Sequence, residues 1–85
     1  MTLGKLPVVS GRRLIRWLGS LDYHIVRQRG SHIVLERRSH SGTHSITVPN
    51  HYEIAKGTLH DILGAVARNL NQNRQDLILS LKEFA

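Results

Sequence analysis

His32 is the residue whose type and setting best suit chemistry in this chain. It ends the basic corner Gln28-Arg29-Gly30-Ser31-His32, between the alternating segment 23–27 and the apolar segment 33–37. Two runs rich in β-branched residues, joined across a glycine, predict a β-hairpin. The ladders of a hairpin fix the backbone of a corner residue within reach of water. Because an unperturbed imidazole has a pKa of about 6.5, His32 can give or take a proton near neutral pH.

RNA cleavage is a chemistry that such a histidine can serve. The 2′-hydroxyl of RNA is a built-in nucleophile beside the scissile phosphate, so the enzyme adds a base, an acid and positive charge. One positioned histidine supplies one of the proton transfers, worth roughly 10²–10⁴-fold. Arg27, Arg29 and Lys56 are the cations that we expect near His32. On composition alone, the alternative is a structural or solvated corner histidine flanked by ordinary solvated arginines.

The chain contains six histidines, which raises the question of a metal site. His40 and His44 are four residues apart, but they flank a Ser-Gly turn, and no carboxylate or cysteine joins them locally. A metal site needs three or four converging ligands. We therefore expect solvated loop histidines and no metal.

Nucleophilic and cofactor chemistry find little support in the sequence. Ser31 and His32 do not form a Ser–His pair, because adjacent strand residues point to opposite faces. Gly30 and Gly57 stand alone, so neither a Walker loop nor a dinucleotide-binding loop is present. We expect no small-molecule cofactor.

Length and composition predict one small folded domain of 85 residues with 40 % apolar content. No cysteine is present, which excludes disulfides and thiolate metal sites. The sequence has no signal-peptide pattern and no apolar run of the length that spans a membrane, so we expect a cytoplasmic protein without a membrane partner.

The net charge of +6 is unevenly distributed along the chain. Residues 1–60 hold nine basic and three acidic side chains, whereas residues 61–85 hold three of each. An uneven basic field attracts polyanions, of which nucleic acid is the commonest in a cytoplasm. A merely solubilising surface is the alternative.

The elements that must position His32 follow from apolar periodicity. Ser10 predicts the N-cap of an amphipathic helix that ends at Asp22, and a third strand at 44–48 follows the hairpin. If Ile33 and Leu35 point inward, His32 points away from the core, although Val34 shares its face.

Two further helices complete the predicted fold. Thr58 and Asp61 approximate a capping box at the start of the first, and a polar break at 69–73 separates it from a short helix at 75–84. The resulting order is α-β-β-β-α-α. We predict the α+β class, as a two-layer sandwich with a three-stranded meander and helices on one face.

In three ordered motifs the sequence resembles the HicA family of toxins, small ribosome-independent mRNA interferases from type II toxin–antitoxin pairs. The resemblance covers roughly residues 10–66. The matching segments are Ser10-Gly11-Arg12-Arg13-Leu14-Ile15, Val26-Arg27-Gln28-Arg29-Gly30-Ser31-His32, and Val48-Pro49 with Lys56-Gly57-Thr58-Leu59-His60-Asp61-Ile62-Leu63.

The resemblance implies an α-β-β-β-α fold like that of double-stranded-RNA-binding domains. Residues 1–85 would form one HicA-like domain, and its core would cover about residues 10–70. The segment 71–85 would be a C-terminal helical extension, and its neutral charge suggests packing or protein contact. Asp22 departs from the glycine that the family usually has before an aromatic residue.

The resemblance also implies an endoribonuclease acting on mRNA, with His32 as general base or acid and a HicB-type antitoxin as partner. We assign RNA contacts to Arg27, Arg29, Gly30, Ser31 and Lys56. The second proton-transfer group stays open, with His24 and His44 as candidates.

Two other functions remain open. One is a non-catalytic RNA-binding module on the same scaffold, although the four Trp, Tyr and Phe residues are too few for a base-stacking platform. The other is a protein-interaction domain that uses Trp17 and the tail helix.

Overall fold

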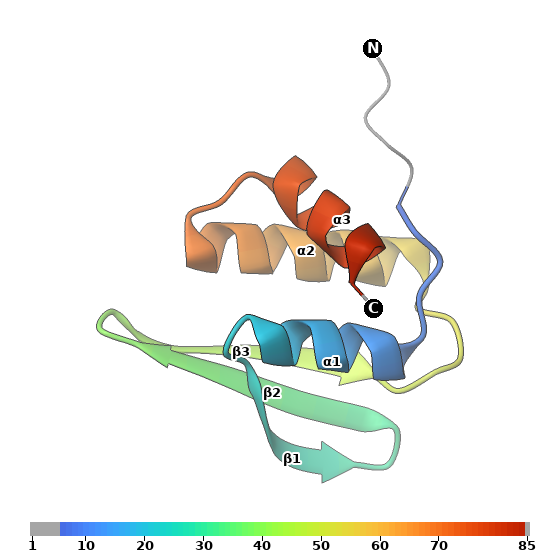
Figure 1. Cartoon of the computed structure of the whole chain (residues 1–85). Helices are drawn as coiled ribbons and strands as arrows, with labels where there is room; N and C mark the ends of the chain where they lie inside the picture. Colours follow the sequence, from blue (N-terminus) through green and yellow to red (C-terminus); the bar gives the residue numbers. More distant parts are fainter. Residues whose placement is uncertain (1–5, 85) are drawn as a thin grey trace. The chain divides into compact units, whose positions relative to one another are not determined.

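The computed structural model describes residues 6–84 and confirms the α+β class and the predicted order of elements (Figure 1). The described chain divides into two compact units: one holds Val9–Ile54, and the other holds Ala55 onward together with the residues before Val9. No helix in the described part is both long and apolar enough to cross a membrane. The elements are α1 (Gly11–Ser20), β1 (His24–Arg29), β2 (His32–Ser39), β3 (Gly42–Pro49), α2 (Lys56–Leu70) and α3 (Arg74–Glu83).

Helix α1 begins and ends as its sequence predicts. The Ser10 hydroxyl accepts a hydrogen bond from the Arg13 backbone N–H (3.1 Å), which satisfies one of the free donors of the first turn. At the other end Asp22 takes a left-handed conformation with φ of 71°. The N–H of Tyr23 bonds the carbonyl of Leu18 (3.1 Å), the 6→1 bond of a Schellman motif. Asp22 therefore fills the turn position that most often takes glycine.

The sheet has the order β1-β2-β3 with antiparallel pairing, so β2 is the central strand. Ile33 and Leu35 are buried and lie opposite the buried Val48 and Ile46 of β3. This confirms that they point toward the core of the unit. α1 packs against the sheet on the side of β3 and contributes buried side chains of its own, from Leu14, Trp17 and Leu18. His32, Val34 and Glu36 lie on the opposite side, called the outer face below.

In the second unit, α2 and α3 pack together through apolar side chains. The buried residues are Leu59, Ile62, Leu63, Val66 and Ala67 of α2 and Leu77, Ile78 and Leu81 of α3. The predicted capping box is wrong, since the N-cap is Ala55 and no side chain caps the helix. The Ala55 carbonyl already accepts the first helical hydrogen bond, from the Leu59 N–H (2.9 Å), so Thr58 lies inside the first turn.

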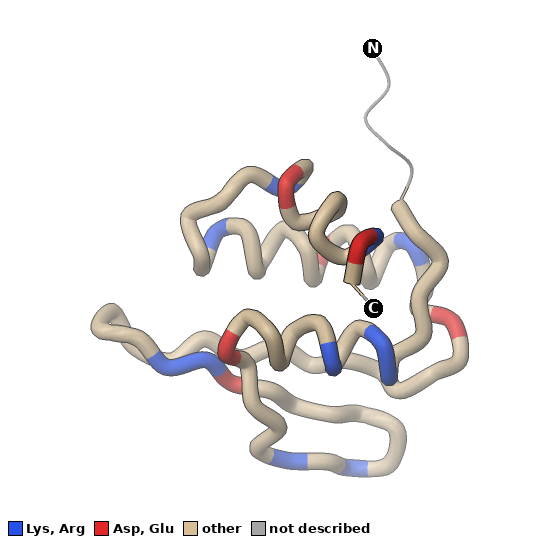
Figure 2. The backbone as a smooth tube through the Cα atoms, viewed as in Figure 1, with Lys and Arg blue, Asp and Glu red and all other residues tan. Residues whose placement is uncertain are grey.

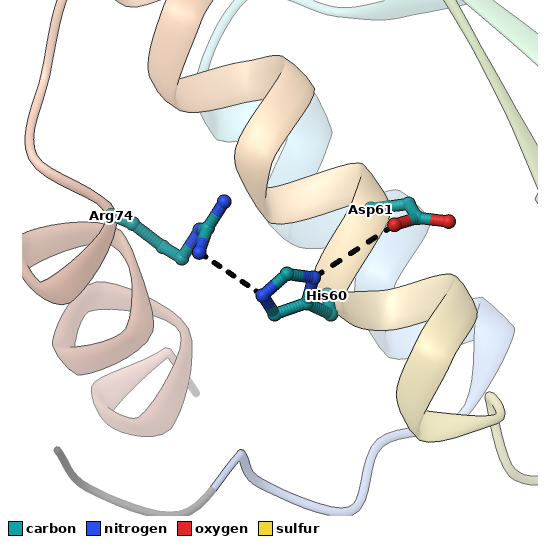
Figure 3. A network of polar contacts seen from close by, with 3 residues as sticks. All are labelled: His60, Asp61 and Arg74. Carbon is teal, nitrogen blue, oxygen red and sulfur yellow. Dashed lines mark hydrogen bonds and ion pairs between the residues drawn. The ribbon is translucent and has the colours of Figure 1, made fainter.

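A polar contact also joins the two helices (Figure 3). A guanidinium nitrogen of Arg74 on α3 lies 3.0 Å from His60 Nε2 on α2. Arginine can only donate, so Nε2 is the acceptor of this contact, and the other ring nitrogen, Nδ1, lies 3.8 Å from an Asp61 carboxylate oxygen. The 71–85 extension therefore forms a helix that packs within its unit as far as it is described.

Candidate active site

His32 is the first residue of β2, and its side chain is exposed. Its backbone is held on both sides, because it pairs with Arg29 of β1 and with Pro49 of β3. The carbonyl of the preceding Ser31 accepts a hydrogen bond from the Asn50 N–H (2.7 Å). The imidazole is thus attached to a fixed backbone while its ring is open to a substrate.

The predicted cations of β1 share the outer face with this histidine. Arg29 lies directly opposite His32, and Arg27 lies opposite Val34. Opposite residues of an antiparallel pair have Cβ atoms about 4.5–5.5 Å apart, so the Arg29 guanidinium can reach a phosphate held at the imidazole. Figure 2 shows the basic segments of β1 running up to the turn.

A β-bulge brings Arg27 to this face. Ile25 pairs with Leu35 on the inner face, and regular alternation would place Arg27 on the same side as Ile25. The register shifts between these two residues, and Arg27 consequently pairs with Val34 on the outer face. The bulge therefore sets both β1 arginines beside His32.

Gly30 and Ser31 form the two-residue loop between β1 and β2 and are exposed. Gly30 has φ of 58°, a conformation that favours glycine at the first position of a type II′ turn. The Gln28 side-chain amide donates to the Gly30 carbonyl (3.2 Å) and braces the loop. Four of the five predicted RNA contacts therefore lie with His32 in one unit; the fifth, Lys56, is the exposed first residue of α2 in the other unit.

The two candidates for a second proton-transfer group lie elsewhere. His44 pairs with Arg37 on the inner face, and its Nδ1 lies 2.8 Å from the Tyr23 hydroxyl. Burial raises the pKa of Tyr23, against a smaller opposing effect of the Arg37 charge. His24 lies opposite Glu36, four residues along β2 from His32, or about 13 Å at the rise of a strand. The structure places neither histidine beside His32.

Sequence reasoning ended the second strand at residue 37, whereas β2 continues to Ser39, and so it missed Arg38. Arg38 shares the outer face with His32, and Glu36 on the same face accepts a hydrogen bond from the Ser45 hydroxyl (3.5 Å). Alternation along β2 places Glu36 and Arg38 on this face, and the register with β3 adds Ser45. A hollow also opens between the start of α1 and the loop that follows β3, and it is lined by Ser10, Arg12, Asn50, His51 and Tyr52.

No group of three or more histidine, aspartate or glutamate side chains converges as a metal-ligand set within residues 6–84.

Comparison with known proteins gives one informative match. The family model described as the HicA toxin of bacterial toxin–antitoxin systems matches residues 11–67. This segment runs from the start of α1 into α2 and leaves out α3. Comparison with curated proteins and with solved structures gives no match.

Proposed function

The chain belongs to the HicA family of toxins from bacterial toxin–antitoxin systems, and we propose that it is an endoribonuclease that cleaves mRNA through His32. The observation that carries the proposal is the exposed imidazole at the first residue of the central strand, directly opposite Arg29. A proton-transfer group and a cation on one rigid face are what a substrate with its own nucleophile requires.

The proposed reaction is an in-line transfer within the RNA. The 2′-oxygen forms a bond to the adjacent phosphorus while the bond to the 5′-oxygen breaks, giving a 2′,3′-cyclic phosphate and a 5′-hydroxyl end. One proton leaves the 2′-hydroxyl, and one joins the departing 5′-oxygen. His32 carries out one of these transfers, as general base or general acid, and Arg29 and Arg27 stabilise the charge on the phosphoryl oxygens.

We also propose the setting in which this activity operates. The partner is a HicB-type antitoxin that masks His32 on the outer face, and the site of action is the cytoplasm, where mRNA is translated.

Cleavage needs no metal, because the nucleophile comes from the substrate and the positive charge comes from arginine. A chelator should accordingly leave the cleavage rate unchanged.

The test compares His32→Ala with the wild type and with His40→Ala. His40 is the control, because it is also an exposed histidine at a hairpin turn, in the two-residue loop that joins β2 to β3. We expect His32→Ala to abolish growth arrest on expression and to slow cleavage of a single-stranded RNA by roughly 10²–10⁴-fold. His40→Ala should retain both activities.

Circular dichroism and thermal unfolding establish that the two variants are folded. Equal RNA cleavage by folded His32→Ala and wild type would refute the assignment of His32. A wild type that binds RNA without cleaving it would identify a non-catalytic RNA-binding module.

A further inference from the structure

We propose that the hollow between the start of α1 and the loop after β3 is a nucleotide subsite. It would hold one base and one phosphate of single-stranded RNA next to the cleaved bond. The inference rests on the proposed ribonuclease function, because it names a second part of the substrate site. All five lining residues lie in the same unit as His32: Ser10, Arg12, Asn50, His51 and Tyr52.

The hollow lies at the same end of the sheet as His32. Pro49 pairs with His32, and the next residue, Asn50, donates its N–H to the carbonyl of Ser31. Paired Cα atoms are about 5 Å apart and consecutive ones 3.8 Å apart, so the Cα of His51 lies within about 13 Å of the Cα of His32. An RNA strand with its scissile phosphate at His32 therefore has a neighbouring nucleotide within reach of the hollow.

Tyr52 supplies a surface for a base. Of the four Trp, Tyr and Phe side chains, Trp17 and Tyr23 are buried and Phe84 is half-buried, whereas Tyr52 is 101 % exposed. A fully exposed ring at the rim of a hollow can stack on an unpaired base, which every base permits through its π-face. One ring stacks one base, which needs no extended aromatic platform.

Arg12 supplies the charge for a phosphate. Its side chain is exposed, and neither Arg12 nor Tyr52 forms a side-chain hydrogen bond or ion pair within residues 6–84. A guanidinium can bind a phosphate through two parallel hydrogen bonds. Both side chains are therefore available to a ligand.

Two backbone N–H groups at the start of α1 already have partners. The Ser10 hydroxyl accepts from the Arg13 N–H, and the Gly11 N–H donates to the carbonyl of His51 (2.8 Å). The recognition that we propose uses the side chains of Tyr52 and Arg12, and the Gly11 bond holds the loop that carries Tyr52 against the helix.

The test measures binding of a fluorescently labelled single-stranded RNA octamer to the full chain by anisotropy. Every protein carries His32→Ala, so that cleavage cannot consume the probe. We expect Tyr52→Ala to weaken binding about 5- to 150-fold, the range found for stacking aromatics, and Tyr52→Phe to retain wild-type affinity. Arg12→Gln should weaken binding and lower the slope of log affinity against log salt by about 0.7. Arg68→Gln, an equal charge change on an exposed residue of α2, serves as the control for Arg12→Gln.

The outcomes separate this inference from the proposed function. Unchanged affinity in Tyr52→Ala and Arg12→Gln, with strong binding by the His32→Ala parent, would overturn the subsite and leave the nuclease proposal intact. Loss of affinity in these variants, with no cleavage by the wild type, would support the subsite and overturn the nuclease. Normal RNA binding combined with loss of antitoxin binding would assign the hollow to a protein partner and overturn the inference.

Discussion

His32 combines a fixed backbone with an open side chain. Strands on both sides hold the residue, and the Ser31 carbonyl beside it is bonded to Asn50, so little conformational freedom remains to be lost when substrate binds. His44 shows the contrast, because its ring is engaged by the buried Tyr23 through a hydrogen bond and a T-shaped contact with centroids 5.8 Å apart. The imidazole is therefore exposed at position 32 and held by a buried partner at position 44.

The pair of Tyr23 and His44 predicts a pH dependence of stability. Burial raises the pKa of Tyr23 above its ordinary value of 10.0, so the folded chain disfavours the ionised phenol. This contribution to the free energy of unfolding is fully present below about pH 10 and is lost as the pH rises through the raised value. Tyr23→Phe should be less stable at pH 7 by about 0.5–1.5 kcal/mol, for the lost hydrogen bond.

Urea unfolding of wild type and Tyr23→Phe at pH 7 and about pH 11 checks this expectation. The stability difference should shrink at the higher pH, because only the wild type has a buried phenol at position 23 to ionise. A difference that is equal at both pH values would contradict it.

At the scale of elements, two local features position the site. The bulge in β1 moves Arg27 to the outer face, and the close approach of α1 to the loop after β3 fixes the residues that follow Pro49. A Cβ built on Gly11 would lie 2.6 Å from the Pro49 carbonyl oxygen and 2.8 Å from the Asn50 Cα. Gly11, the second residue of the first matching motif, is therefore required by backbone packing.

Gly11→Ala should lower the free energy of unfolding by roughly 1–3 kcal/mol, as overpacking typically does, because backbone atoms cannot retract as a flexible side chain would. Gly19→Ala is the matched control in the same helix, since nothing lies within 4 Å of its added Cβ. Alanine is the better helix former by about 1 kcal/mol, so the control should be neutral or stabilised. Chemical denaturation of both variants measures the effect, and equal stability of the two would refute it.

For the whole molecule, the dominant property is positive charge. The unit Val9–Ile54 contains seven lysine and arginine residues against three aspartate and glutamate residues, and Arg12, Arg27 and Arg29 lie at the proposed substrate surfaces. Contacts of this kind act through release of counterions from the nucleic acid, which makes affinity fall steeply with salt.

The salt dependence of RNA binding by full-length His32→Ala should reflect these contacts. Three phosphate contacts on a single strand predict a slope of log affinity against log salt of about −2. Fluorescence anisotropy over a series of salt concentrations gives this slope. A value near zero would mean that the positive charge is incidental to function, as in a protein-interaction domain.

The sequence by itself determined the order of elements, the left-handed turn at Asp22, the inward phase of Ile33 and Leu35, and the position of His32 in a hairpin corner. These features depend on the local conformational preferences of the residues and on the period-two alternation of a strand. Both can be read directly from the sequence.

Only the tertiary structure decided which residues share the surface of His32. The bulge reverses the face of Arg27, and the strand register sets Arg29 directly opposite His32. The fold also brings Arg12 to Tyr52, forty residues farther along the chain. Pairing and packing between distant segments set these relations, and neither leaves a periodic signal in the sequence. The capping box predicted at Thr58 failed for a local reason, because the N-cap of α2 lies three residues earlier, where the Ala55 carbonyl accepts the first helical hydrogen bond.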